Sequence, residues 1–482
     1  MAHLKSLLKD TAIYGMSSIV GRFLNYLLVP LYTAKLAAAS GGYGVMTNLY
    51  GYTALLLVIL TFGMETTFFR FANRSELNLS RVYSTTLCLV GSVALAFIAL
   101  ILLCLTPIAT AMGYAEHPEY VAMMFCCVAV DAFQCIPFAY LRYQKRPIKF
   151  ATLKLAFITI NIVLNLLFFL VLPSTIGLRI DVGYAFAINL FCTLLITPCF
   201  YKELTGFRYV FDKAIARKML GYSWPLLLLG IAGILNQTID KIIFPILYPG
   251  HEGQVQLSIY GGCVKIAMIM AMITQAFRYA YEPFVFGKVK DKDNRDTYAK
   301  AMKYFLIFTL FAFLVVMSYM DLLRHLVGRD YWDGLRVVPI VMVAEIMMGI
   351  YFNLSFWYKI IDKTIWGAWF SGAGCLVLLT LNILFVPRYG YMACAWAGVA
   401  GYGTAMLLSY VVGQRKYPIA YPLGSMALYV AITALFTAII MFLPTTWSPW
   451  LRMCVNTLLL LAFLAHCLYH DFPQLWKKLL KR

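Results

Sequence analysis

The sequence has few charged residues for its length, since Asp, Glu, Lys and Arg make up only 13% of its 482 residues. A soluble globular protein carries roughly 25% charged residues. Hydrophobic residues make up 62% of the chain, and no polar stretch is long enough to form a soluble domain. We therefore expect an all-α polytopic membrane protein whose apolar faces have lipid as their solvent.

Other absences narrow the function. The 12 cysteines all lie in apolar segments and none forms a CxxC motif, so we expect neither disulfides nor a metal site. No nucleotide-binding motif is present. The longest candidate external loop, residues 321–336, is short and holds no catalytic constellation. We therefore predict that the protein is not an enzyme and that it has no catalytic residues and no cofactor.

Apolar runs predict about fourteen transmembrane helices. A helix needs about 20 apolar residues to cross a hydrocarbon core about 30 Å thick. The predicted spans lie near residues 11–36, 42–69, 82–106, 120–140, 150–172, 182–201, 219–247, 257–286, 302–320, 337–357, 365–386, 391–412, 423–443 and 450–466.

The basic residues predict the orientation. Of the 40 Lys and Arg residues, 29 lie in one alternating set of loops and termini, and seven lie in the other set. Short loops rich in Lys and Arg stay in the cytoplasm. Both termini are therefore predicted to be cytoplasmic. The same placement accounts for the net charge of +19 without nucleic acid as a partner.

The two halves of the chain resemble each other at an offset of about 217 residues. The matched positions are Tyr43-Gly44 with Tyr260-Gly261, Glu65 with Glu282, Arg142 with Lys359, and the segments 165–168 and 382–385. We interpret them as two six-helix lobes in parallel orientation around a central cavity. The predicted parts are an N-terminal lobe (1–201), a basic linker (202–218), a C-terminal lobe (219–412) and two additional spans with a basic tail (413–482).

Four basic residues remain within predicted spans: Arg22, Lys241, Lys265 and Arg278. A charge at mid-bilayer costs at least about 2.5–3.5 kcal/mol, so such residues usually face a water-filled cavity or a partner. Arg grips phosphate bidentately and Lys acts as a point charge. We predict that the four residues bind an anionic substrate. The alternative is that they only neutralise buried acids.

The nearby polar residues Glu65, Asp240, Glu282 and Asn25 are candidates for a gate or for ion pairs. Arg278 and Glu282 are four residues apart, so they can pair on one helix face. Asp240 and Lys241 are adjacent in sequence, so their side chains leave a helix about 100° apart and need not pair.

One segment carries a resemblance to a known family. Residues 18–36 (SIVGRFLNYLLVPLYTAKL), Gly42-Tyr43-Gly44, residues 62–65 (FGME) and Phe71 resemble the opening of bacterial polysaccharide-biosynthesis transporters. These are the O-antigen and capsule flippases of the multidrug/oligosaccharidyl-lipid/polysaccharide exporter superfamily. The resemblance implies translocation of an undecaprenyl-pyrophosphate-linked oligosaccharide across the bacterial inner membrane by alternating access, for lipopolysaccharide O-antigen, capsule or exopolysaccharide.

The resemblance also implies partners in the bilayer, namely the lipid-linked oligosaccharide and polysaccharide assembly proteins. Ion coupling is proposed for the superfamily, but no site for a proton or sodium ion is evident in the sequence. The first alternative function is a multidrug cation antiporter, which favours an acidic cavity. A peptidoglycan-precursor flippase has a related plan, and a membrane polysaccharide polymerase needs a larger external loop than this chain has.

Overall fold

The structure is a computed structural model that describes residues 26–74, 77–287, 294–361, 363–444, 446–471 and 473, with residues 279–287 and 294 described by backbone alone. Throughout these ranges the secondary structure is helical and no strand occurs. The contacts divide the chain into two compact units, Met1–Gly261 (unit 1) and Gly262–Arg482 (unit 2).

Unit 1 contains eleven α-helices among its described residues, three short irregular helices and the first turns of a twelfth α-helix. They are α2 (Leu28–Lys35), η1 (Ala38–Ser40), α3 (Gly42–Thr61), α4 (Met64–Ala72), α5 (Leu79–Leu103), α6 (Leu105–Ala111), α7 (Pro118–Tyr143), α8 (Pro147–Leu166), η2 (Leu167–Val171), α9 (Leu172–Ile176), α10 (Gly183–Ile196), η3 (Thr197–Phe200), α11 (Tyr201–Thr205), α12 (Lys213–Leu247) and the start of α13 (His251–Gly287). Within the unit, α7 packs against α5, α3 and α10, and α12 packs along α3.

Unit 2 contains the rest of α13 and the remaining helices. They are α14 (Asn294–Ser318), α15 (Met320–Leu323), η4 (Arg324–Leu326), η5 (Arg329–Arg336), α16 (Val337–Leu354), α17 (Phe356–Ile360), α18 (Ile365–Tyr389), α19 (Tyr391–Lys416), α20 (Leu423–Phe442) and α21 (Pro449–Asp471). Here α19 packs against α18 and α16, while α20 and α21 pack on α14.

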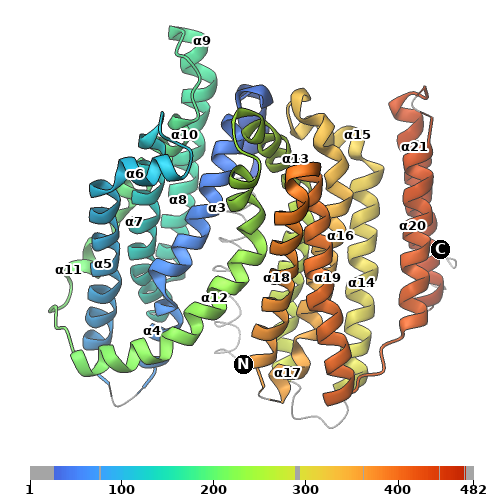
Figure 1. Cartoon of the computed structure of the whole chain (residues 1–482). Helices are drawn as coiled ribbons and strands as arrows, with labels where there is room; N and C mark the ends of the chain where they lie inside the picture. The colour runs from blue at the N-terminus through green and yellow to red at the C-terminus, as the bar shows by residue number, and fades with distance from the viewer. Residues whose placement is uncertain are drawn as a thin grey trace. The chain divides into compact units, whose positions relative to one another are not determined.

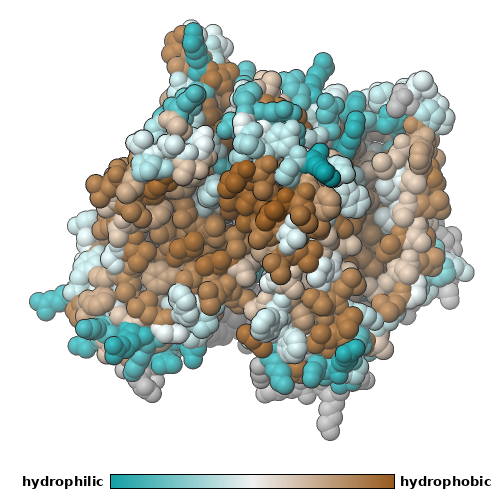
Figure 2. Space-filling model, in the orientation of Figure 1, coloured by the Kyte–Doolittle hydropathy of each residue, from teal (hydrophilic) through white to brown (hydrophobic). Residues whose placement is uncertain are grey.

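Thirteen helical segments of the described residues are long and apolar enough to cross a membrane. They match the second to fourteenth predicted spans, so the predicted all-α polytopic membrane fold is confirmed. Of the first predicted span, 11–36, only residues 26–36 lie in the described ranges. In Figure 2, apolar side chains cover the middle of the helices and hydrophilic ones gather at their ends, as lipid around the helices requires.

The helix α12 is longer than a membrane needs. Its 35 residues span about 52 Å, against a hydrocarbon core of about 30 Å. Its first part crosses the ends of α4 and α5, and the rest then turns to run along α3 (Figure 1). Pro225 lies within the helix and has no N–H to donate to Gly221, which explains a bend in this region.

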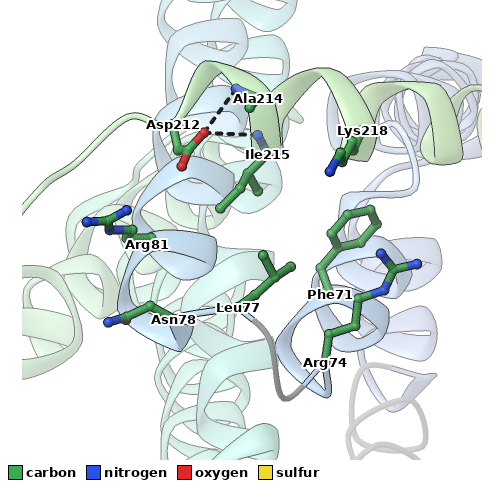
Figure 3. A pocket seen from close by; sticks show the side chains of 9 residues that line it. All are labelled: Phe71, Arg74, Leu77, Asn78, Arg81, Asp212, Ala214, Ile215 and Lys218. Carbon is green, nitrogen blue, oxygen red and sulfur yellow. Dashed lines mark hydrogen bonds between the residues drawn. The ribbon is translucent and has the colours of Figure 1, made fainter.

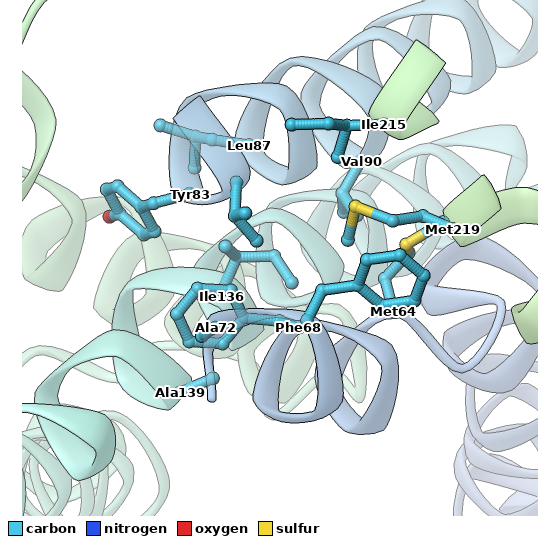
Figure 4. Close-up of a cluster of buried hydrophobic side chains, with 12 residues drawn as sticks. Met64, Phe68, Ala72, Tyr83, Leu87, Val90, Ile136, Ala139, Ile215 and Met219 are labelled. Carbon is cyan, nitrogen blue, oxygen red and sulfur yellow. The ribbon is translucent and has the colours of Figure 1, made fainter. Parts of the chain in front are cut away.

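A buried apolar cluster lies where α4, α5, α7 and α12 meet (Figure 4). Phe68 is fully buried there and contacts the rings of Tyr83, Tyr140 and Tyr143 edge-on. The Tyr83 and Tyr140 rings stack with centroids 4.0 Å apart. Because dense aromatic packing resists displacement, this cluster fixes the start of α12 against α4, α5 and α7.

The compact units follow contacts, whereas the predicted lobes follow the internal repeat. The two divisions differ for residues 219–261, which the repeat assigns to the C-terminal lobe and the contacts group with unit 1. The lobes therefore remain a prediction.

Candidate functional site

The structure describes three of the four cations that the sequence singled out, since Arg22 lies outside the described residues, as does Asn25. Lys241 on α12 forms an ion pair with its neighbour Asp240, with 2.9 Å between Nζ and Oδ1. The Tyr260 hydroxyl donates to the other oxygen of Asp240 at 2.8 Å. The adjacent side chains therefore do pair, because the long Lys241 chain bends back to the carboxylate.

A proline explains a second contact of this cluster. Pro245 lacks the N–H that would bond to the carbonyl of Lys241 four residues earlier. The Asn48 side chain from α3 donates to that carbonyl at 2.7 Å and to the carbonyl of Ile242 at 3.2 Å. The Tyr114 hydroxyl in turn donates to the Asn48 amide oxygen at 2.7 Å. The backbone group that Pro245 frees is thus satisfied by a buried side chain, as an apolar medium requires.

Two glycines allow α3 to approach the start of α13 closely. A Cβ on Gly44 would lie 2.1 Å from the backbone oxygen of Gln254, and a Cβ on Gly261 would lie 2.2 Å from the Thr47 hydroxyl. The Gly44 N–H also donates to the Ser258 hydroxyl at 2.6 Å. The predicted repeat matches Gly44 with Gly261. Both glycines lie where α3 crosses the start of α13, so each helix has a small residue at the crossing.

The acid Glu65 lies at the other end of unit 1, near the α4–α5, α7–α8 and α11–α12 connections, which we call the basic end. It pairs with Arg142, whose guanidinium also lies 5.2 Å from the Phe69 ring. The repeat matches this pair with Glu282 and Lys359. The Glu282 side chain lies outside the described residues, so the predicted pairing of Arg278 with Glu282 stays a prediction.

In unit 2, Lys265 and Arg278 lie on the same helix, α13. Lys265 is half-buried and engages a neighbouring group. The Arg278 guanidinium lies 5.1 Å from the Phe352 ring of α16, and its buried Nε has no hydrogen-bond partner among the described residues. Thirteen residues of helix separate the two by about 20 Å along the axis and about 140° around it. They therefore do not converge on one phosphate but lie at two depths of α13.

Sequence reasoning missed a polar cluster inside unit 1. Asp131 on α7 accepts a hydrogen bond from Thr193 on α10 at 3.2 Å, and Gln134 donates to the backbone oxygen of Thr193 at 2.7 Å. The 29 Lys and Arg residues counted in the basic loops and termini include Lys154, which is wrong, because Lys154 lies within α8 with its Nζ 4.1 Å from the Phe138 ring. The fifth predicted span begins near residue 150, so the sequence alone could have identified Lys154 as a fifth cation within the spans.

The described residues contain no group of three or more His, Cys, Asp and Glu side chains that could hold a metal ion. They do contain several cations within helices. Lys241 is paired with Asp240 and Arg142 with Glu65, and both acids are predicted gate residues. In α13, by contrast, Arg278 forms no ion pair among the described residues, and its guanidinium lies against the Phe352 ring. Such a guanidinium retains donors with which to bind an oxyanion.

The sequence of the chain matches a known protein family. A family model described as "Polysaccharide biosynthesis protein" matches residues 7–281, which is more than half of the chain. No curated protein matches the chain in sequence.

Solved structures share the fold at low sequence identity. A structure of the lipid II flippase MurJ in an inward closed conformation aligns with a TM-score of 0.74 and 14% identity, over 95% of this chain and 98% of that one. An inward-facing multidrug resistance MATE family transporter of the MOP superfamily aligns with a TM-score of 0.64 and 15% identity, over 85% and 95%. The MATE multidrug transporter DinF-BH aligns at 0.58 and 15% identity, over 84% and 95%.

Proposed function

Because the chain belongs to the polysaccharide biosynthesis protein family and has the fold of flippases and MOP-superfamily transporters, we propose that it flips an undecaprenyl-pyrophosphate-linked oligosaccharide across the bacterial inner membrane. The proposed product is a surface glycan: O-antigen, capsule or exopolysaccharide. The basic end then faces the cytoplasm, with both termini, in accordance with the distribution of Lys and Arg.

The observation that carries the proposal is the placement of Arg278. It sits in a membrane-spanning helix beside the Phe352 ring, and its buried Nε has no hydrogen-bond partner in the part of the chain that the structure describes. A guanidinium at such a site binds a pyrophosphate through charge-assisted hydrogen bonds. The substrate is proposed to meet Arg278 first, nearer the cytoplasm, and Lys265 later, about 20 Å further along α13. Arg22 is proposed to belong to the same path.

The multidrug antiporter is the second candidate, because MATE transporters share the fold. That function favours unneutralised acids in the cavity. Here Glu65 is paired with Arg142, and Asp240 with Lys241 and Tyr260. These pairings favour an anionic cargo. The chain is also proposed to act by alternating access and to work beside polysaccharide assembly proteins; the coupling ion, proton or sodium, stays open.

The test replaces Arg22, Lys265 and Arg278 by Ala, one at a time, in the producing cell. Surface glycan should fall sharply in each variant while the amount of protein in the membrane stays constant. Arg415→Ala is the matched control, because Arg415 is an exposed cation in the last turn of α19. Normal glycan in all three variants would contradict the proposal. Loss of dye export instead of glycan would favour the antiporter.

A further inference from the structure

A second cationic site lies at the basic end of unit 1, outside the membrane-spanning path. It is a cavity of about 360 Å³, at the lower end of the roughly 300–1,000 Å³ that is common for small-molecule sites. Three segments line it: the end of α4, the start of α5 and the start of α12. The lining residues are Phe71, Arg74, Leu77, Asn78, Arg81, Asp212, Ala214, Ile215 and Lys218.

The charges of this pocket are unbalanced. Arg74, Arg81 and Lys218 carry three positive charges, and no ion pair involves any of them in the described ranges. Among the described residues of the lining the single acid is Asp212. It is the N-cap of α12 and accepts from the N–H groups of Ala214 and Ile215 at 2.9 and 3.0 Å (Figure 3). An anion entering the pocket would therefore meet an excess of positive charge.

The apolar wall of the pocket is rigid. Phe71 and Ile215 belong to the buried cluster at the junction of α4, α5, α7 and α12, and they are only 3% and 7% exposed. In Figure 3, Arg74 and Lys218 point toward the Phe71 ring, and Arg81 lies on the opposite side near Asn78. The Arg74 guanidinium lies 4.8 Å from the centre of that ring. Cations held beside a fixed apolar wall suit a ligand with both a charged and an apolar part.

The surroundings of the pocket suit a membrane surface. The start of α12 crosses the ends of α4 and α5 before the helix bends (Figure 1). Near the pocket, Tyr209, Phe211 and Trp224 are more than half exposed, at 55%, 54% and 61%. Exposed aromatic residues beside Lys and Arg are typical of the boundary between headgroups and acyl chains. A dissolved anion needs no such apolar surroundings, whereas a lipid does.

We propose that this pocket binds the phosphate group of a lipid at the cytoplasmic membrane surface, with Arg74, Arg81 and Lys218 holding the phosphate and Phe71, Leu77 and Ile215 contacting the apolar part. The phosphate comes either from a phospholipid headgroup or from a polyprenyl pyrophosphate. The pocket shares no residue with the proposed substrate path along α13, and the inference does not rest on the transported substrate.

The experiment measures lipid binding to the purified full-length protein in detergent by native mass spectrometry. The probes are phosphatidylglycerol, undecaprenyl pyrophosphate and, as a phosphate-free lipid, dioleoylglycerol. Both phosphate lipids are compared because the tighter one identifies the source. The triple variant Arg74→Ala, Arg81→Ala, Lys218→Ala should weaken binding of that lipid about 100-fold, since each cation near an anionic lipid contributes about fivefold.

The matched control is the triple variant Lys202→Ala, Lys213→Ala, Arg217→Ala. It removes the same charge from the same end of unit 1, at exposed positions that do not line the pocket. Its affinity should change less than threefold. Equal losses in both triple variants would mean general surface attraction and overturn the proposal, as would unchanged binding in both or equal binding of dioleoylglycerol.

A pair of single variants guards against misfolding. Lys218→Ala should lower affinity about fivefold, and Lys213→Ala on the same helix should not. If the two single variants bind alike, the pocket is not the site. Because transport is not measured, a failure here leaves the proposed flippase function intact, and normal lipid binding does not rescue a failed flippase test.

Discussion

Lys241 and Arg278 are both cations in membrane-spanning helices, yet their surroundings differ. Lys241 is neutralised by Asp240, which also accepts from Tyr260, and the backbone beside it is satisfied by Asn48. Arg278 lies beside Phe352, and its Nε has no hydrogen-bond partner within the described ranges. The charge of Lys241 is therefore neutralised within α12, whereas the guanidinium of Arg278 in α13 is the one proposed to bind the substrate.

The largest effect should separate these two cations. Arg278→Ala should lower glycan transport about 100-fold, because two charge-assisted hydrogen bonds to a phosphate contribute roughly 3 kcal/mol. Asp240→Asn combined with Lys241→Met keeps the site neutral and should lower transport less than threefold. Transport is measured as flipping of the lipid-linked oligosaccharide in proteoliposomes. Equal losses of transport in the two variants would show that Arg278 and the Asp240–Lys241 pair do not differ in their role.

The next effect concerns the helix crossing beside Lys241. Gly44→Ala places a Cβ 2.1 Å from the Gln254 oxygen, so α3 and α13 must separate. We expect a loss of stability of about 2 kcal/mol, seen as a lower melting temperature in detergent. Gly233→Ala is the control, since no atom lies within 4 Å of a Cβ there. A melting temperature as high as that of the control would show that the crossing is loose.

A smaller effect tests why Asn48 is needed. Asn48→Ala leaves the Lys241 carbonyl without a donor and should cost about 1–2 kcal/mol of stability. Pro245→Ala restores the N–H that bonds this carbonyl within α12. The loss from Asn48→Ala should therefore shrink in the Pro245→Ala background. Additive losses in the double variant, measured by thermal unfolding, would show that the proline and the asparagine are independent.

The smallest effect belongs to the ion pair of Glu65 with Arg142. Their side chains are 43% and 30% exposed, so solvent screens the pair. Glu65→Gln should lower stability by less than about 1 kcal/mol. A much larger drop in melting temperature, or a transport defect at normal stability, would mean that Glu65 does more than hold the basic end together.

Much of the fold follows from local pattern. Long apolar runs predicted thirteen spans that the structure contains, because a helix in lipid must satisfy its own backbone and expose apolar side chains. The pattern of apolar and basic residues was less informative about where a single charged side chain lies and which group it contacts. Lys154 was counted as a loop residue although its helix begins at Pro147, and Lys241 was found to reach Asp240, which helical periodicity did not require.

Composition and the order of apolar and basic segments by themselves determined that this is a multi-pass helical membrane protein, because solvation of each segment depends only on its own residues. Only the tertiary structure decided which intramembrane cations are neutralised, which backbone carbonyl Asn48 satisfies, and which three surface cations gather around one pocket. Those outcomes depend on contacts between residues as many as 194 positions apart in the chain, for which no local pattern exists.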